Sequence, residues 1–216
     1  MRQFFSLIAI LAGLAGCVTQ ETARQQVSQL DAAKPCCTRL DELPFAKAPS
    51  GQNISVEITP ASPVYEVLGR NRYIAAYELP ADPKPAVLSL RSYFAYAPYQ
   101  EHMPILHPSV LFLDANKQQI MAIDQSAFRY AREGLFEGAG LEARIQINTE
   151  NFQPRYMVIY AGAIGQQDSR AVTTPMVMVP VMIGSVMVPM TSGGGAAPTL
   201  PMPTGSLRLS IREARN

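Results

Sequence analysis

Apolar and polar residues alternate along much of this chain with a period of two, which is typical of half-buried β-strands. Ile54, Val56 and Ile58 alternate with polar residues in this way, and so do the apolar residues between positions 141 and 147. Proline, glycine, asparagine or aspartate separates the strand-sized segments, and no long amphipathic helix lies between them. The pattern predicts an all-β fold, an antiparallel and jelly-roll-like β-sandwich. The other predicted strands span residues 64–68, 72–79, 86–94, 110–113, 156–160 and 207–211.

Three segments carry weaker helical signals. Residues 18–34 are polar and, after Val18, contain only two large apolar residues, Val27 and Leu30, which predicts a partly helical tether. Thr38 is a candidate N-cap for one or two helical turns that end before Pro44. Within the β-domain, residues 166–173 are the one segment predicted to add a short helix.

Residues 174–203 form an apolar arm of unusual composition, with six of the ten methionines. Two apolar stretches flank Gly184 and Ser185, which predicts a hairpin with a tight turn. Because Pro180 and Pro189 donate no backbone hydrogen bond, the two stretches are expected to be edge or irregular strands. Clustered thioethers suit Cu(I), but the alternation of methionine with valine favours a flexible apolar arm that packs on the domain, a partner or lipid.

The first sixteen residues have the pattern of a secretory signal peptide. Arg2 supplies a positive charge, residues 4–14 are almost wholly apolar, and this run is too short to span a bilayer of about 30 Å. Residues 14–17, Leu-Ala-Gly-Cys, resemble the bacterial lipobox, in which the thiol receives a diacylglyceryl group and cleavage leaves the cysteine first. Lipidation is therefore expected at Cys17. Since Val18 follows instead of aspartate, the resemblance implies the periplasmic leaflet of the outer membrane.

The expected organisation is a signal peptide at 1–16, a lipidated tether with a short helix at 17–50, and a β-sandwich domain at 51–216 that includes the arm. Only Arg2 among the 18 basic residues lies in the predicted leader, so 17 basic residues balance 17 acidic ones in the remainder. This neutrality argues against nucleic acid as a partner.

The remaining cysteines are the neighbours Cys36 and Cys37, which are candidates for a vicinal disulfide in an oxidising compartment. Bridges to other chains and metal binding are the alternatives. The chain has only two histidines, His102 and His107, both far along the sequence, so no Cys/His zinc site and no cofactor is expected. A structural or redox-labile pair near the tether is the preferred interpretation.

Catalytic patterns are weak. The serines lack a Gly-x-Ser-x-Gly context, and the two histidines fall in a Tyr- and Pro-rich loop at 98–108. Glu133, Glu137 and Glu142 are candidates for an acid–base pair in glycoside cleavage, but the first two precede glycines and indicate turns between strands. The sequence therefore predicts a protein that is not an enzyme.

Several strand segments resemble the maltose operon periplasmic protein family. They include Ile-Ala-Ala-Tyr-Glu-Leu-Pro at 74–80, Leu-Ser-Leu-Arg-Ser at 88–92 and Pro-Ser-Val-Leu-Phe-Leu-Asp-Ala-Asn at 108–116. Downstream, Ser-Ala-Phe-Arg-Tyr at 126–130, Leu-Glu at 141–142, Tyr-Met-Val-Ile-Tyr at 156–160 and Gly-Ser-Leu-Arg-Leu at 205–209 keep the family's order. The resemblance covers about residues 53–212 and implies a periplasmic protein without enzymatic activity, associated with carbohydrate transport.

Two functions follow as hypotheses. The first is glycan binding by an anchored domain, because aromatic faces with a few polar groups suit sugar rings. The candidate residues are Tyr93, Phe94, Tyr96, Tyr99 and His102, for which packing in the core or in loops is the alternative interpretation. The second is a structural lipoprotein that braces an envelope complex through its apolar arm. The expected partners are the membrane, through the lipid, and an envelope protein or a glycan.

Overall fold

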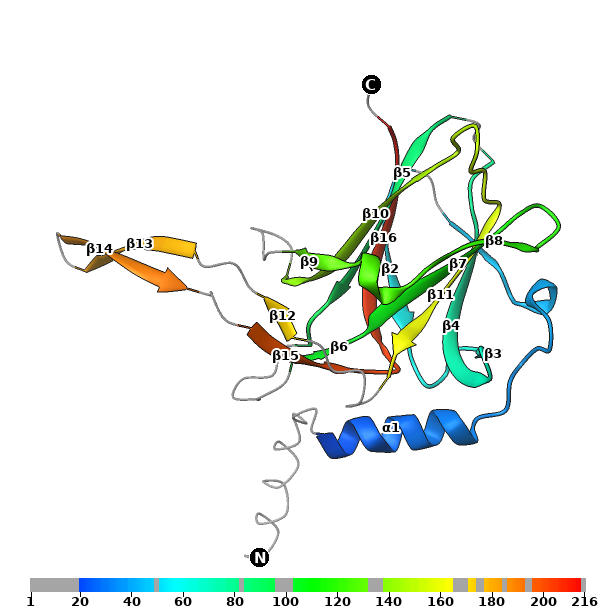
Figure 1. Ribbon diagram of the computed structural model, residues 1–216, viewed down its shortest axis with the longest axis horizontal. Coiled ribbons are helices and arrows are strands. Elements are labelled where there is room, and N and C mark those ends of the chain that lie inside the picture. Colours follow the sequence, from blue (N-terminus) through cyan, green and yellow to red (C-terminus); the bar gives the residue numbers. More distant parts are fainter. Residues whose placement is uncertain are drawn as a thin grey trace, which may run out of the picture.

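The computed structural model describes residues 20–48, 51–81, 84–95, 103–131, 138–164, 171–173, 177–183, 186–192 and 196–214, and between 171 and 197 it describes the backbone. Cys17, Tyr96, Tyr99, His102, Glu133 and Glu137 lie outside these residues. The described chain is mostly β-structure in antiparallel sheets, as predicted (Figure 1).

The first sheet has the strand order β1-β4-β11-β7-β8, and β3 also pairs with β4. Its edge strand β1 runs parallel to β4, whereas the other pairs are antiparallel. The strands are β1 (Ala46–Lys47), β3 (Val64–Val67), β4 (Arg70–Glu78), β7 (His107–Leu113), β8 (Gln119–Ile123) and β11 (Tyr156–Ala163).

The second sheet has the order β2-β16-β5-β10-β9 and is antiparallel throughout. Its strands are β2 (Asn53–Ile58), β5 (Ala86–Tyr93), β9 (Arg129–Ala131), β10 (Gly140–Ile147) and β16 (Gly205–Glu213). Apolar residues of both sheets share one buried cluster, for example Leu88 and Leu209 from the second sheet with Phe112 and Ile159 from the first. The core therefore lies between the two sheets.

The outer faces of the two sheets differ. A second apolar cluster, with Ile74, Leu111 and Val158, lies on the outer face of the first sheet under the segment of Leu40 and Phe45. The first sheet is thus covered on both faces. In the second sheet, buried and more exposed residues alternate along β10 and β16, so its outer face is polar. Any site on a sheet face is expected on the second sheet.

Helix α1 (Gln20–Ala32) confirms the helical part of the predicted tether, but it lies against the folded body. Leu30 is 1% exposed and Ala23 3% exposed. The side-chain amide of Asn71 on β4 donates to the carbonyl oxygens of Leu30, at 3.2 Å, and Ala33, at 2.7 Å. The carbonyl oxygen of Leu30 also accepts from the backbone N–H of Ala33 at 3.1 Å, so Asn71 adds a side-chain donor at the end of the helix. The helix therefore packs on the folded domain through the buried side chains of Ala23 and Leu30 and through the hydrogen bonds from Asn71.

Several strand boundaries and one helix differ from the sequence prediction. The turn before β4 contains Leu68 and Gly69, both with positive φ, so β4 begins at Arg70 and not at the predicted residue 72. Residues 171–173, predicted as part of a helix, form strand β12 (Ala171–Thr173) because they pair with β15 (Ala196–Pro201). The 3-10 helix η1 (Leu40–Glu42) gives the predicted turn before Pro44, but its N-cap is Arg39 and not Thr38.

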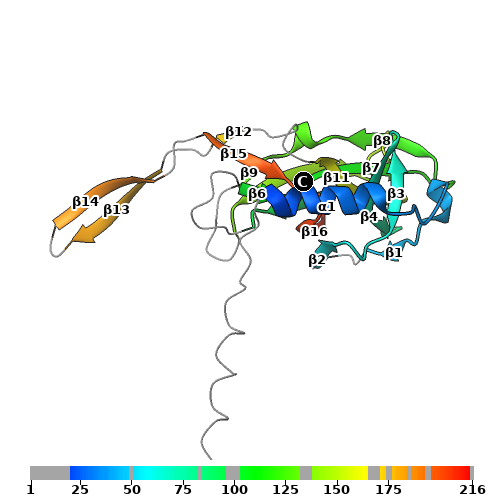
Figure 2. The same ribbon diagram turned by 90° about the horizontal axis from the view of Figure 1, so that it is seen from below.

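The predicted arm at 174–203 is shorter in the structure. Strand β15 pairs in parallel with β6 (Met103–Ile105), and Thr199 and Leu200 on it are buried. Only β13 (Val177–Ile183) and β14 (Val186–Ser192) project from the body, as the predicted hairpin, in both views (Figures 1 and 2). We call this two-stranded segment, residues 177–192, the ribbon.

Candidate functional site

The outer face of the second sheet carries an open groove of about 270 Å³. Alternation places its residues outward, because their neighbours Leu88, Leu90, Leu209 and Ile211 are buried in the core. The groove is lined by Asn53, Val87, Ser89, Arg91, Glu142, Arg144, Arg208, Ser210 and Arg212. Four arginines and one glutamate give this lining a net formal charge of +3.

Strand pairing arranges the groove residues in rows. In the first row Arg208 lies opposite Arg91, and Arg91 lies opposite Glu142. In the second row Ser89 on β5 lies between two cross-strand partners, Ser210 on β16 and Arg144 on β10. A third row contains Arg212, opposite Val87. The two serines therefore occupy the middle of the groove and arginines surround them.

Glu142 is the centre of a hydrogen-bonded cluster. One carboxylate oxygen accepts from Arg144 Nε at 2.6 Å and from Ser89 Oγ at 3.1 Å, and the other lies 3.9 Å from Arg91. Arg91 also donates to the carbonyl oxygen of Gly138 at 2.7 Å. The side chains of Arg91 and Glu142 are 11% and 16% exposed. These contacts fix Arg91 on the floor of the groove.

Tyr93 follows Arg91 on the same face of β5. The guanidinium carbons of Arg91 and Arg208 lie 5.8 Å and 5.7 Å from its ring centroid, within the range of cation–π contacts. Its hydroxyl is buried and has no hydrogen-bond partner among the described residues. Of the two aromatic candidates that the structure describes, Tyr93 and Phe94, Tyr93 thus lies beside the groove.

Phe94 points to the opposite side of the sheet. It packs against the core cluster, and its ring centroid lies 6.3 Å from that of Tyr130. The packing interpretation therefore holds for Phe94. His107 is also buried, in strand β7 and not in the predicted loop, and its Nε2 lies 2.9 Å from Thr199 Oγ1. This pair connects the sheet that contains β15 to the body.

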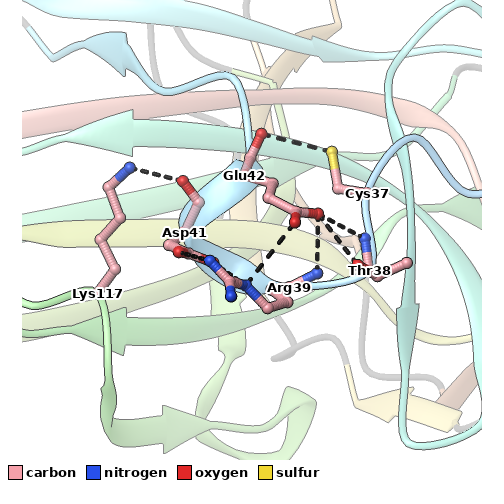
Figure 3. A network of polar contacts seen from close by, with 6 residues as sticks. All are labelled: Cys37, Thr38, Arg39, Asp41, Glu42 and Lys117. Atoms are coloured by element: carbon pink, nitrogen blue, oxygen red, sulfur yellow. Dashed lines mark hydrogen bonds and ion pairs between the residues drawn. The ribbon is translucent and has the colours of Figure 1, made fainter.

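The structure joins Cys36 and Cys37 in a disulfide. Figure 3 shows the polar contacts of the residues that follow, from Cys37 to Glu42, and of Lys117. Cys37 Sγ contacts the carbonyl oxygen of Glu42 at 3.5 Å, and a carboxylate oxygen of Glu42 accepts from the backbone N–H of Thr38 at 2.9 Å. Arg39 forms an ion pair with Asp41. The hydrogen bond from Arg39 lowers the pKa of Asp41, and the hydrogen bond from the backbone of Thr38 lowers the pKa of Glu42.

Lys117 ties this segment to the body. Its Nζ donates to the carbonyl oxygen of Asp41 at 2.8 Å and lies 4.9 Å and 5.6 Å from the ring centroids of Phe45 and Tyr156. No group of three or more His, Cys, Asp or Glu side chains suited to a metal ion occurs in the described part of the chain. The contacts of Lys117 hold the segment around Cys36 and Cys37 against the first sheet. We call residues 36–45 the clasp.

Sequence reasoning missed the arginines of the groove. Their signal is present in the polar positions of the predicted strands, where Arg208 and Arg212 alternate with Leu209 and Ile211. The sequence predicts Glu142 as a candidate member of an acid–base pair, whereas the structure places it in contact with Arg144 and Ser89. None of the helices among residues that the structure describes is both long and apolar enough to cross a membrane.

The family model described as "Maltose operon periplasmic protein precursor (MalM)" matches residues 70–211, well over half of the chain. The chain belongs to the MalM family. Neither a curated protein nor a solved structure matches it. The MalM match includes Arg91, Glu142, Arg144 and Arg208 of the groove, whereas α1 and the clasp precede it. MalM is described as a periplasmic maltose operon protein and is not a known enzyme family.

Proposed function

We propose that this MalM-family chain is a lipoprotein anchored through Cys17 in the inner leaflet of the outer membrane, where its domain binds carbohydrate for transport without catalysis. The domain is a β-sandwich of the jelly-roll-like type. Family membership supports the periplasm and the link to carbohydrate. The lipobox-like residues 14–17 support the anchor, and two or more acyl chains hold a protein on a membrane for long times.

The observation that carries the binding function is the polar groove on the outer face of the second sheet. Guanidinium and carboxylate groups donate to and accept from sugar hydroxyls, and the ring of Tyr93 lies beside them. Sheet faces with an aromatic ring and fixed polar groups suit the C–H faces and the hydroxyl groups of sugar rings. Arg91 and Glu142 are held in place by their mutual contacts, which favours binding because little side-chain freedom is lost.

The same contacts support a role without catalysis. Glycoside hydrolysis generally uses two carboxyl groups, one of which donates a proton. Glu142 is the one carboxylate among the described residues that line the groove, and its two oxygens face Arg144, Ser89 and Arg91. No second carboxyl group faces Glu142 among these lining residues, so the pair that glycoside hydrolysis needs is not formed there.

A calorimetric titration of the full lipoprotein in lipid nanodiscs tests this function. The titrants are a panel of soluble glycans that includes maltoheptaose. We expect binding by the native chain that is weakened at least tenfold in the variant Arg91→Gln. The matched control Arg24→Gln changes the same charge on the exposed face of α1 and should leave binding intact. Absence of heat with every glycan would contradict the proposal.

The ribbon favours a second candidate function, the bracing of an envelope protein. No charged residue occurs between positions 171 and 207. Register puts Val177, Val179, Val181 and Ile183 on one face with Val186, Val188, Met190 and Ser192. The other face carries Met178, Pro180, Met182, Met187, Pro189 and Thr191. Apart from Thr191 and Ser192 near its base, the residues on both faces of the projecting ribbon are thus apolar, which marks a contact surface.

The paired prolines indicate how such a contact is made. Two residues lie between Ile183 and Val186, so Ile183 and Val186 form a hydrogen-bonded pair. Hydrogen-bonded and non-hydrogen-bonded pairs then alternate along the ribbon, which makes Pro180 and Pro189 a non-hydrogen-bonded pair. The position of each missing N–H is therefore on an outer edge of the ribbon, where strand addition is blocked. The remaining edge groups need hydrogen bonds, which hydrocarbon does not supply. A protein partner that covers an apolar face of the ribbon does not need strand addition and can supply hydrogen bonds to the edges, so we expect a protein to bind there.

The structure allows the ribbon to be removed without disturbing the body. Thr173 and Ala196 are partners at the base, so replacing residues 174–195 by Asn-Gly closes a two-residue hairpin between β12 and β15. In-cell crosslinking of this variant and of the native chain compares their partners. We expect one crosslinked envelope protein to disappear. An unchanged crosslink pattern would contradict the bracing function.

A further inference from the structure

We propose that the groove binds a carbohydrate that carries an oxyanion, either a carboxylate or a phosphate, in preference to a neutral maltodextrin. The inference rests on the proposed carbohydrate-binding function and names the class of ligand. The observations behind it are the positions of charged side chains and of small serine side chains on the three strands β16, β5 and β10.

The first observation is a like-charge pair. Arg91 and Arg208 are direct cross-strand partners, and like charges in that position are unfavourable. Glu142 faces Arg91 from the other side, but its carboxylate also receives Arg144. The lining as a whole keeps a net formal charge of +3, which an anion in the groove would reduce.

The second observation is the small floor between these charges. Ser210 and Ser89 are cross-strand partners in the middle row, and Ser210 is only 9% exposed. Arg208 and Arg212 flank Ser210 on β16, each about 7 Å along the strand by the usual rise. Arg91 flanks Ser89 on β5, and Arg144 lies opposite Ser89 on β10. Hence an oxyanion above the serines has guanidinium groups on several sides.

Guanidinium groups match this ligand in shape. The planar fork of arginine donates two parallel hydrogen bonds to a carboxylate or a phosphate, and charge-assisted bonds are about twice as strong as neutral ones. Arg144 is 73% exposed and Arg212 is also exposed, so both reach a ligand that enters from solvent. By contrast, Arg91 is fixed by Gly138 and Glu142 and presents a preformed surface.

Apolar surface lies at both ends of the same groove. Val87 lines the row of Arg212, and Tyr93 lies beyond the row of Arg91 and Arg208. These residues offer contact to the ring carbons of a sugar, which a bare phosphate ion lacks. The combination of a cationic centre with apolar ends fits a charged sugar better than a simple anion.

The test is a titration of the full lipoprotein in neutral phosphatidylcholine nanodiscs with glucose 1-phosphate, trigalacturonate, inorganic phosphate and maltoheptaose. We expect the two charged sugars to bind at least tenfold more tightly than maltoheptaose and inorganic phosphate. We also expect their affinity to fall as salt rises from 20 to 300 mM, conditions chosen to span screening lengths from above 10 Å to below 10 Å.

The variant Arg208→Gln/Arg212→Gln should lose at least tenfold in affinity for the charged sugars. Its matched control is Arg24→Gln/Lys34→Gln, which removes two exposed positive charges outside the groove, and thermal unfolding shows whether both variants keep the fold. Maltoheptaose binding as tightly as the charged sugars would overturn the inference and leave the proposed function intact. Inorganic phosphate binding as tightly as glucose 1-phosphate would overturn the assignment to a sugar. No response to any glycan would overturn the inference and the proposed function together.

Discussion

Arg91 on β5 and Arg208 on β16 lie directly opposite each other, and both guanidinium groups contact the ring of Tyr93. Because inward residues of the same strands form the core, this pair is held on a rigid sheet face. The pair is what distinguishes the outer face of the second sheet from an ordinary solvated surface.

Glu142→Gln is expected to destabilise the domain. The change weakens the interactions of the carboxylate with Arg144, Ser89 and Arg91, in a site where Glu142 is only 16% exposed. The free energy of unfolding should fall by about 1 to 2 kcal/mol, as for other hydrogen bonds to charged groups. Urea denaturation measures it. The exposed Glu57→Gln serves as the control, with an expected change below about 0.5 kcal/mol. An equal effect of the two changes would contradict the structural role of Glu142.

Asn71→Ala is expected to loosen helix α1. The change removes the side-chain donor to the carbonyl oxygens of Leu30 and Ala33 at the end of the helix, whereas the bond from the backbone N–H of Ala33 to Leu30 remains. We expect a loss of about 1 to 2 kcal/mol in the local stability of α1, because the carbonyls at a buried helix end lose a partner. Hydrogen exchange of the α1 amides measures this loss. The amides of β5 and β10 are the internal reference and should change less than those of the helix.

Acid is expected to loosen the clasp. The pKa values of Asp41 and Glu42 are lowered in the folded chain, below their ordinary 3.8 and 4.5. Groups of this kind stabilise the fold above the unfolded pKa, and the contribution is lost as pH falls through the folded pKa. Carbon NMR titration of the two carboxyl groups should give midpoints below those ordinary values. In Arg39→Gln the midpoint of Asp41 should rise, and in Arg24→Gln it should stay. Ordinary midpoints in the native chain would refute the network.

Replacement of the ribbon prolines is expected to cause self-association. Pro180→Val with Pro189→Val restores one outward N–H on each edge, so that the edges become templates for strand addition. Size-exclusion chromatography with light scattering should show concentration-dependent oligomers of the double variant. Met182→Val, which adds β-propensity without a donor, is the control and should elute as the native chain does. A double variant that matches this control would show that the prolines do not protect the edges.

The sequence predicts the strands of the second sheet well, since the period of two in residues 54–58, 141–147 and 207–211 reflects their half-buried position. The groove was not predicted, because the pairing of Arg91 with Arg208 depends on a register between strands that are far apart along the chain. The period of two shows which residues of a strand are polar, but it does not show whether their face is a binding site or an ordinary solvated surface.

Local composition misled the prediction at two places. Residues 18–34 contain few apolar residues, yet Leu30 with the cap from Asn71 is enough to dock a helix. Thr199 and Leu200 resemble the apolar arm in composition, but pairing with β6 buries them in the body. Tertiary contacts override composition in both cases. The lipobox-like motif, by contrast, depends on local sequence alone, and its prediction at Cys17 concerns a residue outside the described ones.

Attachment at Cys17 is the claim on which the location of the groove and the ribbon depends. Mass spectrometry of the N-terminal peptide, taken from chain purified from the bacterial envelope, tests it most directly. The account predicts that residues 1–16 are absent and that Cys17 carries a diacylglyceryl thioether with further acylation. A free thiol at Cys17, or a leader still joined to it, would contradict the account.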